Sequence, residues 1–171
     1  ELCRLALDAK QSLPDGVDYA NLVTNYVERF ASKLTCFDDI RPHLAALRKT
    51  PDVPHQPLTS ETSITQRINA EKIALFFEQG ASADDLLQAY IESLEHVHEP
   101  STEMQPGDDL ALLAVYVTLA KSSSVENLIQ AAAIASYACE KSARAYKLRL
   151  LLIRLLLRLG CLKLAVYHFD A

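Results

Sequence analysis

Glycine is scarce in this chain: only four of its 171 residues are glycine, and they stand far apart. A loop that cradles a phosphate group needs several glycines close together, because backbone amides must approach the anion closely. The scattered glycines therefore exclude such a loop. We expect each of them at the end of a helix or at a turn instead. They are Gly16, Gly80, Gly107 and Gly160.

Motifs that carry catalysis or hold a metal ion are also missing. The chain has no Gly-x-Ser-x-Gly string to position a nucleophilic serine, and no Arg/Gln-x-x-Gly-x-Gly/Ala loop of the kind that binds acetyl-coenzyme A. His96 and His98 would point about 200° apart around a helix, which is too far to share a metal easily. We therefore predict no catalytic residue, no cofactor site and no metal site. The four cysteines have no Cys-x-x-Cys spacing and are expected to be reduced.

Long alternating runs of β-branched residues are absent, whereas apolar residues recur at three- and four-residue spacing along most of the chain. This pattern predicts an all-α fold with roughly nine helices joined by mostly short loops. The apolar content of 50% is ample for a core. The helices are expected at 2–12, from Asp18 past Phe30, and at 38–48, 64–79, 83–97, 109–121, 125–142, 146–159 and from about 163 onward.

Acidic residues and serines mark several expected helix starts. Asp18, Asp38 and Asp108 are predicted N-caps, and Ser82 with Asp85 is typical of a capping box. The paired acids at helix starts are interpreted as caps and as compensation of the helix dipole, in preference to acid–base pairs. These pairs are Asp38–Asp39, Asp84–Asp85 and Asp108–Asp109.

Helical spacing also predicts which side chains face the core, and where helices begin or end. Pro42 is expected in the first turn of its helix, where its missing donor does least harm, and Gly80 is expected to stop the helix before it. The predicted core-facing residues are Ile68, Ile73 and Phe76 in one helix, and Leu87, Tyr90, Ile91 and Leu94 in the next.

The net charge is only −5, but its distribution is uneven. Residues 71–109 hold ten acidic groups against Lys72 alone, and residues 141–163 hold seven basic groups and no acid. Two interpretations stay open. The charges could cover solvated helix faces, or the basic segment could form a surface for an acidic partner or RNA.

Four cations in the basic segment are predicted to bind a partner. Arg154 and Arg158 are one turn apart and share a helix face, whereas Arg149 lies about 140° from Arg154. The alternative is that these arginines extend to solvent from an apolar helix. The four predicted partner-binding residues are Lys147, Arg149, Arg154 and Arg158.

The run from Leu148 to Leu164 is very apolar, but four cations interrupt its 17 residues. Each charge near a bilayer centre costs about 2.5–3.5 kcal/mol, so we reject a membrane span. A helix packed on several sides explains the run better.

A faint internal repeat accompanies this run. The interval from Leu128 to Leu162 is the same as that from Ala131 to Ala165, and it matches a tetratricopeptide-type helical hairpin, which is about 34 residues long. We call this interval the repeat spacing. Small residues along one helix face let a neighbouring helix approach closely. The predicted structural positions of the repeat are Ala131, Ala135, Ala138, Gly160 and Ala165.

The repeat spacing predicts a tetratricopeptide-like α-solenoid of antiparallel hairpins, although an ordinary α-domain with an alanine-rich helix is the alternative. Residues 50–63 contain three prolines and little periodicity, so we predict a loop between helices of the solenoid. The chain begins at Glu1, has Met104 as its only methionine, and ends within a helical pattern. We therefore expect residues 1–171 to be one internal segment of a longer solenoid.

Four strings in the chain resemble a known family; they occur in that family's order and span most of the chain. They are CFDDIRPHLAAL (36–47), INAEKI (68–73), QPGDDLALLA (105–114), and the stretch from Ser142 through YKLRLLLIRL to LAVYHFDA. Together they resemble the auxiliary, non-catalytic subunit of the N-terminal acetyltransferase B (NatB) complex. The family usually has proline in a Lys-Ser-Pro turn where this chain has Ala143.

The resemblance implies a tetratricopeptide-like solenoid that supports a separate catalytic acetyltransferase subunit in a heterodimer. That partner transfers acetyl from acetyl-coenzyme A to chains that begin Met-Asp, Met-Glu, Met-Asn or Met-Gln. The resemblance also implies a cytoplasmic, ribosome-associated scaffold that is not an enzyme and takes no small-molecule substrate itself. Two other hypotheses stay open: a general solenoid adaptor for peptides or helices, and an all-α enzyme with an unrecognised site.

Overall fold

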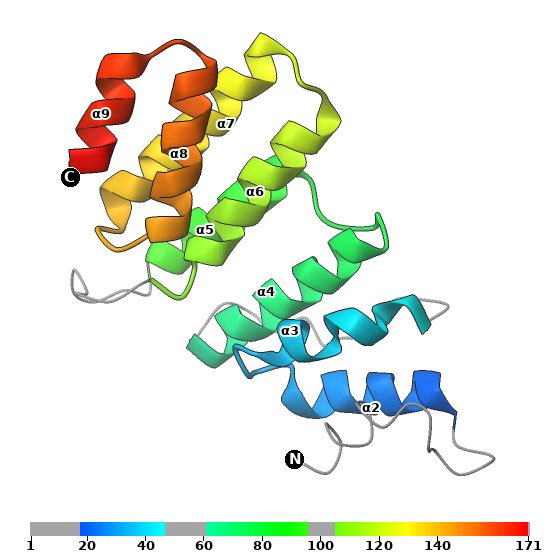
Figure 1. Ribbon diagram of the computed structural model, residues 1–171. Helices are drawn as coiled ribbons and strands as arrows, with labels where there is room; N and C mark the ends of the chain where they lie inside the picture. Colours follow the sequence, from blue (N-terminus) through cyan, green and yellow to red (C-terminus); the bar gives the residue numbers. More distant parts are fainter. Residues whose placement is uncertain (1–17, 47–60, 96–104, 171) are drawn as a thin grey trace. The chain divides into compact units, whose positions relative to one another are not determined.

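The computed structural model describes residues 18–46, 61–95 and 105–170. These ranges contain eight α-helices, one 3-10 helix and no strand, which confirms the predicted all-α class (Figure 1). The predicted helix at 2–12, most of the predicted loop at 50–63, and the pair His96 and His98 lie outside the described residues. The chain divides into two compact units, Glu1–Ala81 and Ser82–Ala171, and each is described by itself.

The first unit is built from three α-helices and a 3-10 helix around one apolar core. The elements are α2 (Tyr19–Phe30), α3 (Cys36–Ile40), η1 (Arg41–Ala46) and α4 (Glu61–Phe76). The core takes buried residues from all four: Val23, Tyr26, Val27, Ala31, Cys36, Ile40, Leu44, Ala70 and Ile73. Burial raises the pKa of the Cys36 thiol to about 12, so this cysteine behaves as a small hydrophobe.

The start of α2 is as predicted, but the start of α3 is not. Asp18 caps α2, because its Oδ1 accepts a hydrogen bond from the Ala20 amide at 3.0 Å. Thr35, and not Asp38, occupies the N-cap position of α3. Pro42 consequently falls beyond the end of α3, not in its first turn. Proline has no amide hydrogen to donate, so the α-helix ends at Ile40 and the chain continues as η1.

Two buried polar side chains of α4 form hydrogen bonds with the segments that follow α2 and α4. The Asn69 amide donates to the Ala31 carbonyl at 2.7 Å and to the Lys33 carbonyl at 2.9 Å, which ties the turn after α2 to α4. Glu71 pairs with Arg67 at 2.8 Å and accepts from the Ala81 amide at 3.2 Å. Glu71 is buried, so the expectation that the acidic segment is a solvated face is wrong at this position.

The end of α4 differs from the prediction in two ways. The residue with a left-handed backbone is Glu78 (φ 58°), so Gly80 does not terminate the helix. A Cβ on Gly80 would instead lie 2.4 Å from Leu75 Cδ2, so close packing explains this glycine. Ile68 and Ile73 are buried as predicted, but Phe76 is 43% exposed. Phe77, four residues after Ile73, takes the core-facing position instead.

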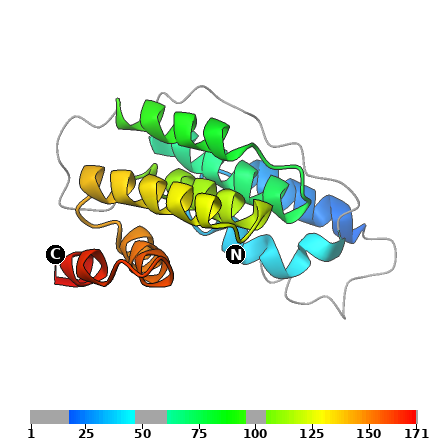
Figure 2. The same cartoon turned by 90° about the horizontal axis from the view of Figure 1, so that it is seen from above.

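The second unit is a series of five helices in which each packs on the next, and α8 also contacts α6. They are α5 (Ala83–Leu94), α6 (Asp108–Lys121), α7 (Val125–Lys141), α8 (Tyr146–Arg158) and α9 (Leu162–Asp170). Figure 2 shows α8 and α9 side by side next to α7. The capping box of Ser82 and Asp85 at the start of α5 is confirmed.

The buried side of α5 is rotated from the predicted stripe. Of the four predicted residues only Tyr90 is fully buried, while Leu87, Ile91 and Leu94 are half-buried. Small residues explain the difference, because they let α6 approach closely. Gly107, next to the start of α6, leaves no space for a side chain: a Cβ there would lie 2.9 Å from Ser93 Cβ. The buried residues of α5 are Ala83, Leu86, Ala89, Tyr90 and Ser93.

Burial in the second unit recurs in part with the repeat spacing found in the sequence. Some residue pairs at this spacing are buried together or exposed together in α6 and α8, and Ala131 of α7 and Ala165 of α9 are both buried. Other pairs differ, because Leu112 and Leu113 are buried where Tyr146 and Lys147 are exposed. The buried pairs in α6 and α8 are Ala114 with Leu148 and Thr118 with Leu152; the exposed pairs are Tyr116 with Leu150 and Ala120 with Arg154. The other predicted repeat positions, Ala135 and Ala138, are fully buried, and Gly160 adopts a positive φ of 76° in the turn before α9.

Candidate interaction surface

One face of α8 presents large apolar and basic side chains to solvent. At 100° per residue, its six members fall within an arc of about 120° around the helix axis. The apolar members are between 52% and 60% exposed, and the basic members are exposed as well. We call this set the α8 face; it consists of Tyr146, Lys147, Leu150, Arg154, Leu157 and Arg158.

The two chemistries lie on separate edges of the α8 face. Tyr146, Leu150 and Leu157 fall within about 40° of one another and form an apolar edge. Lys147, Arg154 and Arg158 form a basic edge beside it. The helix thus presents a continuous apolar strip and a continuous positive strip, both parallel to its axis.

The leucines of the apolar edge are additional to those that fold the unit. Leu148, Leu152 and Leu155 occupy the opposite side of α8 and are at most 2% exposed. Burying a leucine side chain contributes about 1.5–3 kcal/mol, and this inner row already provides the packing of α8. Leu150 and Leu157 contribute no comparable burial to the unit. Their exposure therefore indicates a surface that is available for contacts beyond the described residues.

The cations of the basic edge are almost unpaired among the described residues. Arg154 and Arg158 have no ion pair with any residue that the structure describes, and α8 contains no acidic residue. Lys147 has one partner, Asp109 at the start of α6, at the long distance of 3.9 Å. The edge is therefore a strip of positive potential that is available to an anionic partner.

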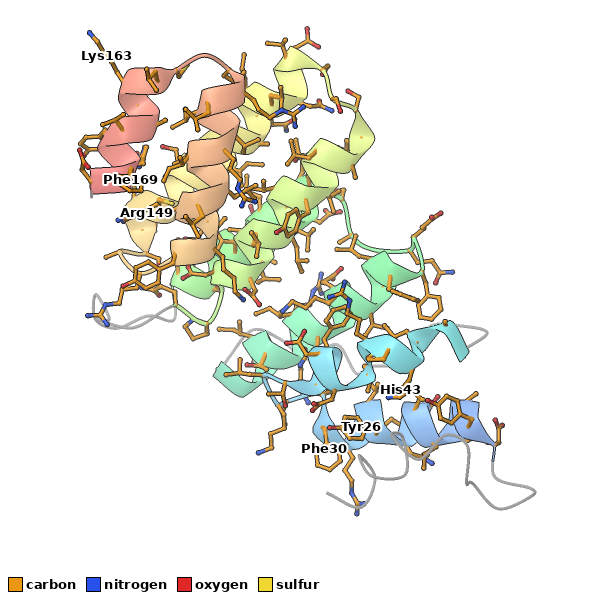
Figure 3. The ribbon with its side chains drawn as sticks, in the orientation of Figure 1. Tyr26, Phe30, His43, Arg149, Lys163 and Phe169 are labelled. Atoms are coloured by element: carbon orange, nitrogen blue, oxygen red, sulfur yellow. The ribbon has the colours of Figure 1, made fainter. Side chains whose placement is uncertain are left out.

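The fourth predicted cation, Arg149, lies away from the α8 face. Its Nη2 donates to the Ala143 carbonyl at 3.2 Å, and the residue is half-buried (Figure 3). Burial raises the pKa of the nearby Cys139 thiol, and the charge of Arg149 partly offsets this effect. Arg149 thus holds together the turn between α7 and α8. Its role in partner binding stays a prediction.

The same side of the hairpins is open in α6. Tyr116 and Ala120 stand one repeat before Leu150 and Arg154 and are exposed like them. Yet α6 is packed against α5, α7 and α8. Neighbouring helices therefore leave the positions of Leu150 and Arg154 uncovered, whereas Leu112 and Leu113, the counterparts of Tyr146 and Lys147, are buried.

A second apolar surface lies on α9, and the sequence-based reasoning missed it. Leu162, Val166 and Phe169 are exposed there, and Phe169 and Lys163 are marked in Figure 3. Only Ala165 of α9 is buried. The repeat spacing alone would have placed these three residues toward a core, because their counterparts in α7 are buried: Leu128, Ala132 and Ala135.

A buried polar cluster joins α6 to the turn before α8. Asp108 Oδ2 accepts from Ser142 Oγ at 2.7 Å and from the Gln105 amide at 3.1 Å. Asp108 is therefore not the N-cap of α6; Gly107 has that position, and it makes no side-chain cap. Asp108 lies inside the first turn, where the α7–α8 junction covers it, so its carboxylate bonds to Ser142.

Burial governs the ionisation of this cluster. Desolvation raises the pKa of Asp108, and the hydrogen bonds from Ser142 and Gln105 oppose that rise without cancelling it. Tyr90 is buried beside it, and desolvation together with the Asp108 charge raises the pKa of its phenol. The cluster is thus a structural joint between successive hairpins, and a further exception to the expected solvated acidic face.

Two other kinds of site are absent from the described ranges. No group of three or more His, Cys, Asp or Glu residues there could hold a metal ion. Of the helices from α2 to α9, none has the length and apolar character needed to cross a membrane.

The whole chain, residues 1–171, matches the model of a family described as the N-acetyltransferase B complex (NatB) non catalytic subunit. The chain belongs to this family. The resemblance carried by the four sequence strings is thereby confirmed. A comparison with curated proteins finds no match. As a NatB non-catalytic subunit the chain is not the acetyltransferase, and its membership of the complex implies a catalytic subunit as partner.

Proposed function

We propose that this chain binds the catalytic subunit of NatB, activates it and helps to place it at the ribosome in the cytoplasm. The observation that carries the proposal is the family match, which extends over the whole chain. The scaffold we propose is a tetratricopeptide-like α-solenoid. Support comes from the antiparallel succession of α6 to α9 and from the pairs that share burial at the repeat spacing, among them Ala114 with Leu148 and Ala131 with Ala165.

Activation would act through conformation, since the acetyl transfer itself belongs to the other subunit. A scaffold stabilises one conformation of its partner only if it binds that conformation more tightly than the others. The free energy of stabilisation equals the difference between the binding free energies. Obligate interfaces of this kind are large, on the order of 2,000 Å² or more. The α8 face and the exposed apolar side of α9 are the surfaces in the second unit that suit such an interface.

Co-expression of the protein with the catalytic subunit of the same organism tests the proposal. We expect one stable complex at micromolar concentration. We also expect faster acetylation of peptides beginning Met-Asp or Met-Glu than the catalytic subunit achieves alone. Recovery of the two proteins as separate monomers would contradict the proposal. A catalytic subunit of another N-terminal acetyltransferase complex serves as the control and should not co-purify.

Placement at the ribosome needs a separate measurement. We expect the assembled complex to sediment with ribosomes at low salt and to be released as salt screens charge–charge contacts. A complex that stays at the top of the gradient at every salt concentration would remove this part of the proposal and leave partner binding intact.

A further inference from the structure

The α8 face has the dimensions of a docking site for a helix. Tyr146, Leu150 and Leu157 are spaced by four and seven residues, so one apolar strip extends along about 16 Å of α8 at 1.5 Å per residue. An amphipathic helix that lies on such a strip contributes its own apolar residues at three-, four- and seven-residue spacing. A helix also satisfies its own backbone hydrogen bonds, so it can cover exposed leucines without leaving polar groups unpaired.

The basic edge specifies the charge of that helix. Lys147, Arg154 and Arg158 lie parallel to the apolar strip with no acid on α8, and arginine binds carboxylates through two parallel hydrogen bonds. A partner helix with apolar residues on one side and Asp or Glu beside them would meet both edges at once. Complementary charge of this kind sets the orientation of a partner as well as its rate of association.

The same cations could in principle meet the phosphates of RNA. RNA bound there would leave the exposed Leu150 and Leu157 uncovered, because phosphate contacts use only the basic edge. Tyr146 alone could stack on a base. The pairing of an apolar edge with a basic edge therefore favours a protein helix.

The repeat spacing shows which part of the α8 face stays open when a hairpin has neighbours. Tyr116 and Ala120 are the counterparts of Leu150 and Arg154, and they stay exposed although α6 has packed helices around it. Leu112 and Leu113, the counterparts of Tyr146 and Lys147, are buried. The part of the α8 face from Leu150 to Arg158, which holds both exposed leucines and both arginines, is therefore the part that a partner can reach.

We infer that the α8 face docks an acidic amphipathic helix of the NatB catalytic subunit, an inference that rests on the proposed function above. The leucines of the apolar edge anchor the helix, and Arg154 and Arg158 pair with its carboxylates. Binding at this face consequently weakens as the salt concentration rises.

Two variants of the α8 face test the inference in the assembled complex. The first, Arg154→Glu/Arg158→Glu, reverses the basic edge, and the second, Leu150→Ala/Leu157→Ala, shortens the apolar edge. We expect each to raise the Kd for the catalytic subunit at least about tenfold. The charge reversal should also flatten the dependence of Kd on salt, whereas the leucine variant should keep it.

A matched control makes the same change of charge elsewhere. Lys121 and Arg144 are exposed and lie outside the α8 face, so Lys121→Glu/Arg144→Glu should bind like the unmodified protein. All of the residues to be changed are on the surface, and circular dichroism of each variant establishes that it is folded. Hydrogen exchange on the catalytic subunit then identifies the segment that the α8 face protects, which should be an acidic amphipathic helix.

The possible outcomes separate the inference from the proposed function. Absence of binding by the unmodified protein overturns both. Normal binding by the two α8-face variants overturns the inference alone, as does protection of a segment that is neither helical nor acidic. Variants that bind the catalytic subunit normally but lose affinity for ribosomal RNA would assign the face to RNA instead.

Discussion

Helices α7 and α9 occupy equivalent places in successive hairpins but have opposite surroundings. Leu128 of α7 is 7% exposed, and Leu162, its counterpart one repeat later, is 63% exposed. Ala135 of α7 is fully buried, whereas Phe169, its counterpart, is 78% exposed. Helix α7 packs against α6 and α8, while α9 packs against α8 among the described helices. A repeated sequence pattern therefore specifies the position of a helix in its hairpin, whereas the helices packed against it determine which of its residues are buried.

Exchanging the residue types of Ala135 and Phe169 tests this comparison, and we expect it to have the largest effect on stability. Ala135→Phe inserts a ring where α7 is closely packed, so we expect the free energy of unfolding to fall by about 3 kcal/mol. Phe169→Ala removes an exposed ring and should change it by less than about 0.5 kcal/mol. Urea unfolding of the two variants provides the measurement. Similar losses for both would show that α7 and α9 have the same surroundings.

Local signals in the sequence predicted much of the fold. The capping box at Ser82 and the cap at Asp18 were predictable because each involves residues three or fewer positions apart. The errors at Phe76, at the stripe of α5 and at Asp108 have a common cause. In each case a neighbouring segment determined which side chain is buried, and one helix's own pattern does not contain that information.

The candidate site was predictable in part for the same reason. Helical spacing alone places Arg154 and Arg158 on one face and Arg149 on another, and the structure agrees. Leu150 and Leu157 were missed because they belong to a run in which leucines of the inner and outer sides alternate. The packing of α8 against α6, α7 and α9 distinguishes the two sets.

The comparison extends to the two junctions of α8 with its neighbours, which lie before its start and after its end. Hydrogen bonds to Asp108 hold the first junction, which we call the first joint. Asp108→Ala removes the acceptor of Ser142 Oγ and of the Gln105 amide, and it leaves both donors buried. Leaving buried donors unpaired costs about 1–3 kcal/mol, so we expect about 2 kcal/mol of destabilisation. Asp109→Ala is the matched control on the adjacent, less buried residue and should cost less than half as much. Equal effects would show that Asp108 acts only through the helix dipole.

The second joint depends on backbone conformation. Gly160 has a φ of 76°, and a Cβ at this position would meet no other atom within 4 Å. Gly160→Ala therefore isolates the cost of a left-handed backbone, which we expect to be about 1 kcal/mol. Thermal unfolding measures it. A change to Asn, which tolerates this conformation better, should recover part of the loss, and no recovery would point to a packing effect instead.

The smallest expected effect is a pH dependence of the stability that Asp108 contributes at the first joint. Burial raises the pKa of Asp108 above its ordinary value, so the folded protein binds a proton at a pH where the unfolded chain has released it. The free energy of unfolding contributed by this group therefore falls as pH rises between those two pKa values. Asp108→Asn keeps an acceptor for Ser142 and cannot ionise.

Relative to the unmodified protein, the Asn variant should thus be most stable near pH 7 and lose that advantage toward about pH 4. Urea unfolding across this range measures the difference. A difference that does not vary with pH would mean that the Asp108 carboxylate ionises as readily in the joint as it does in water. The hydrogen bonds from Ser142 and Gln105 would then fully offset its burial.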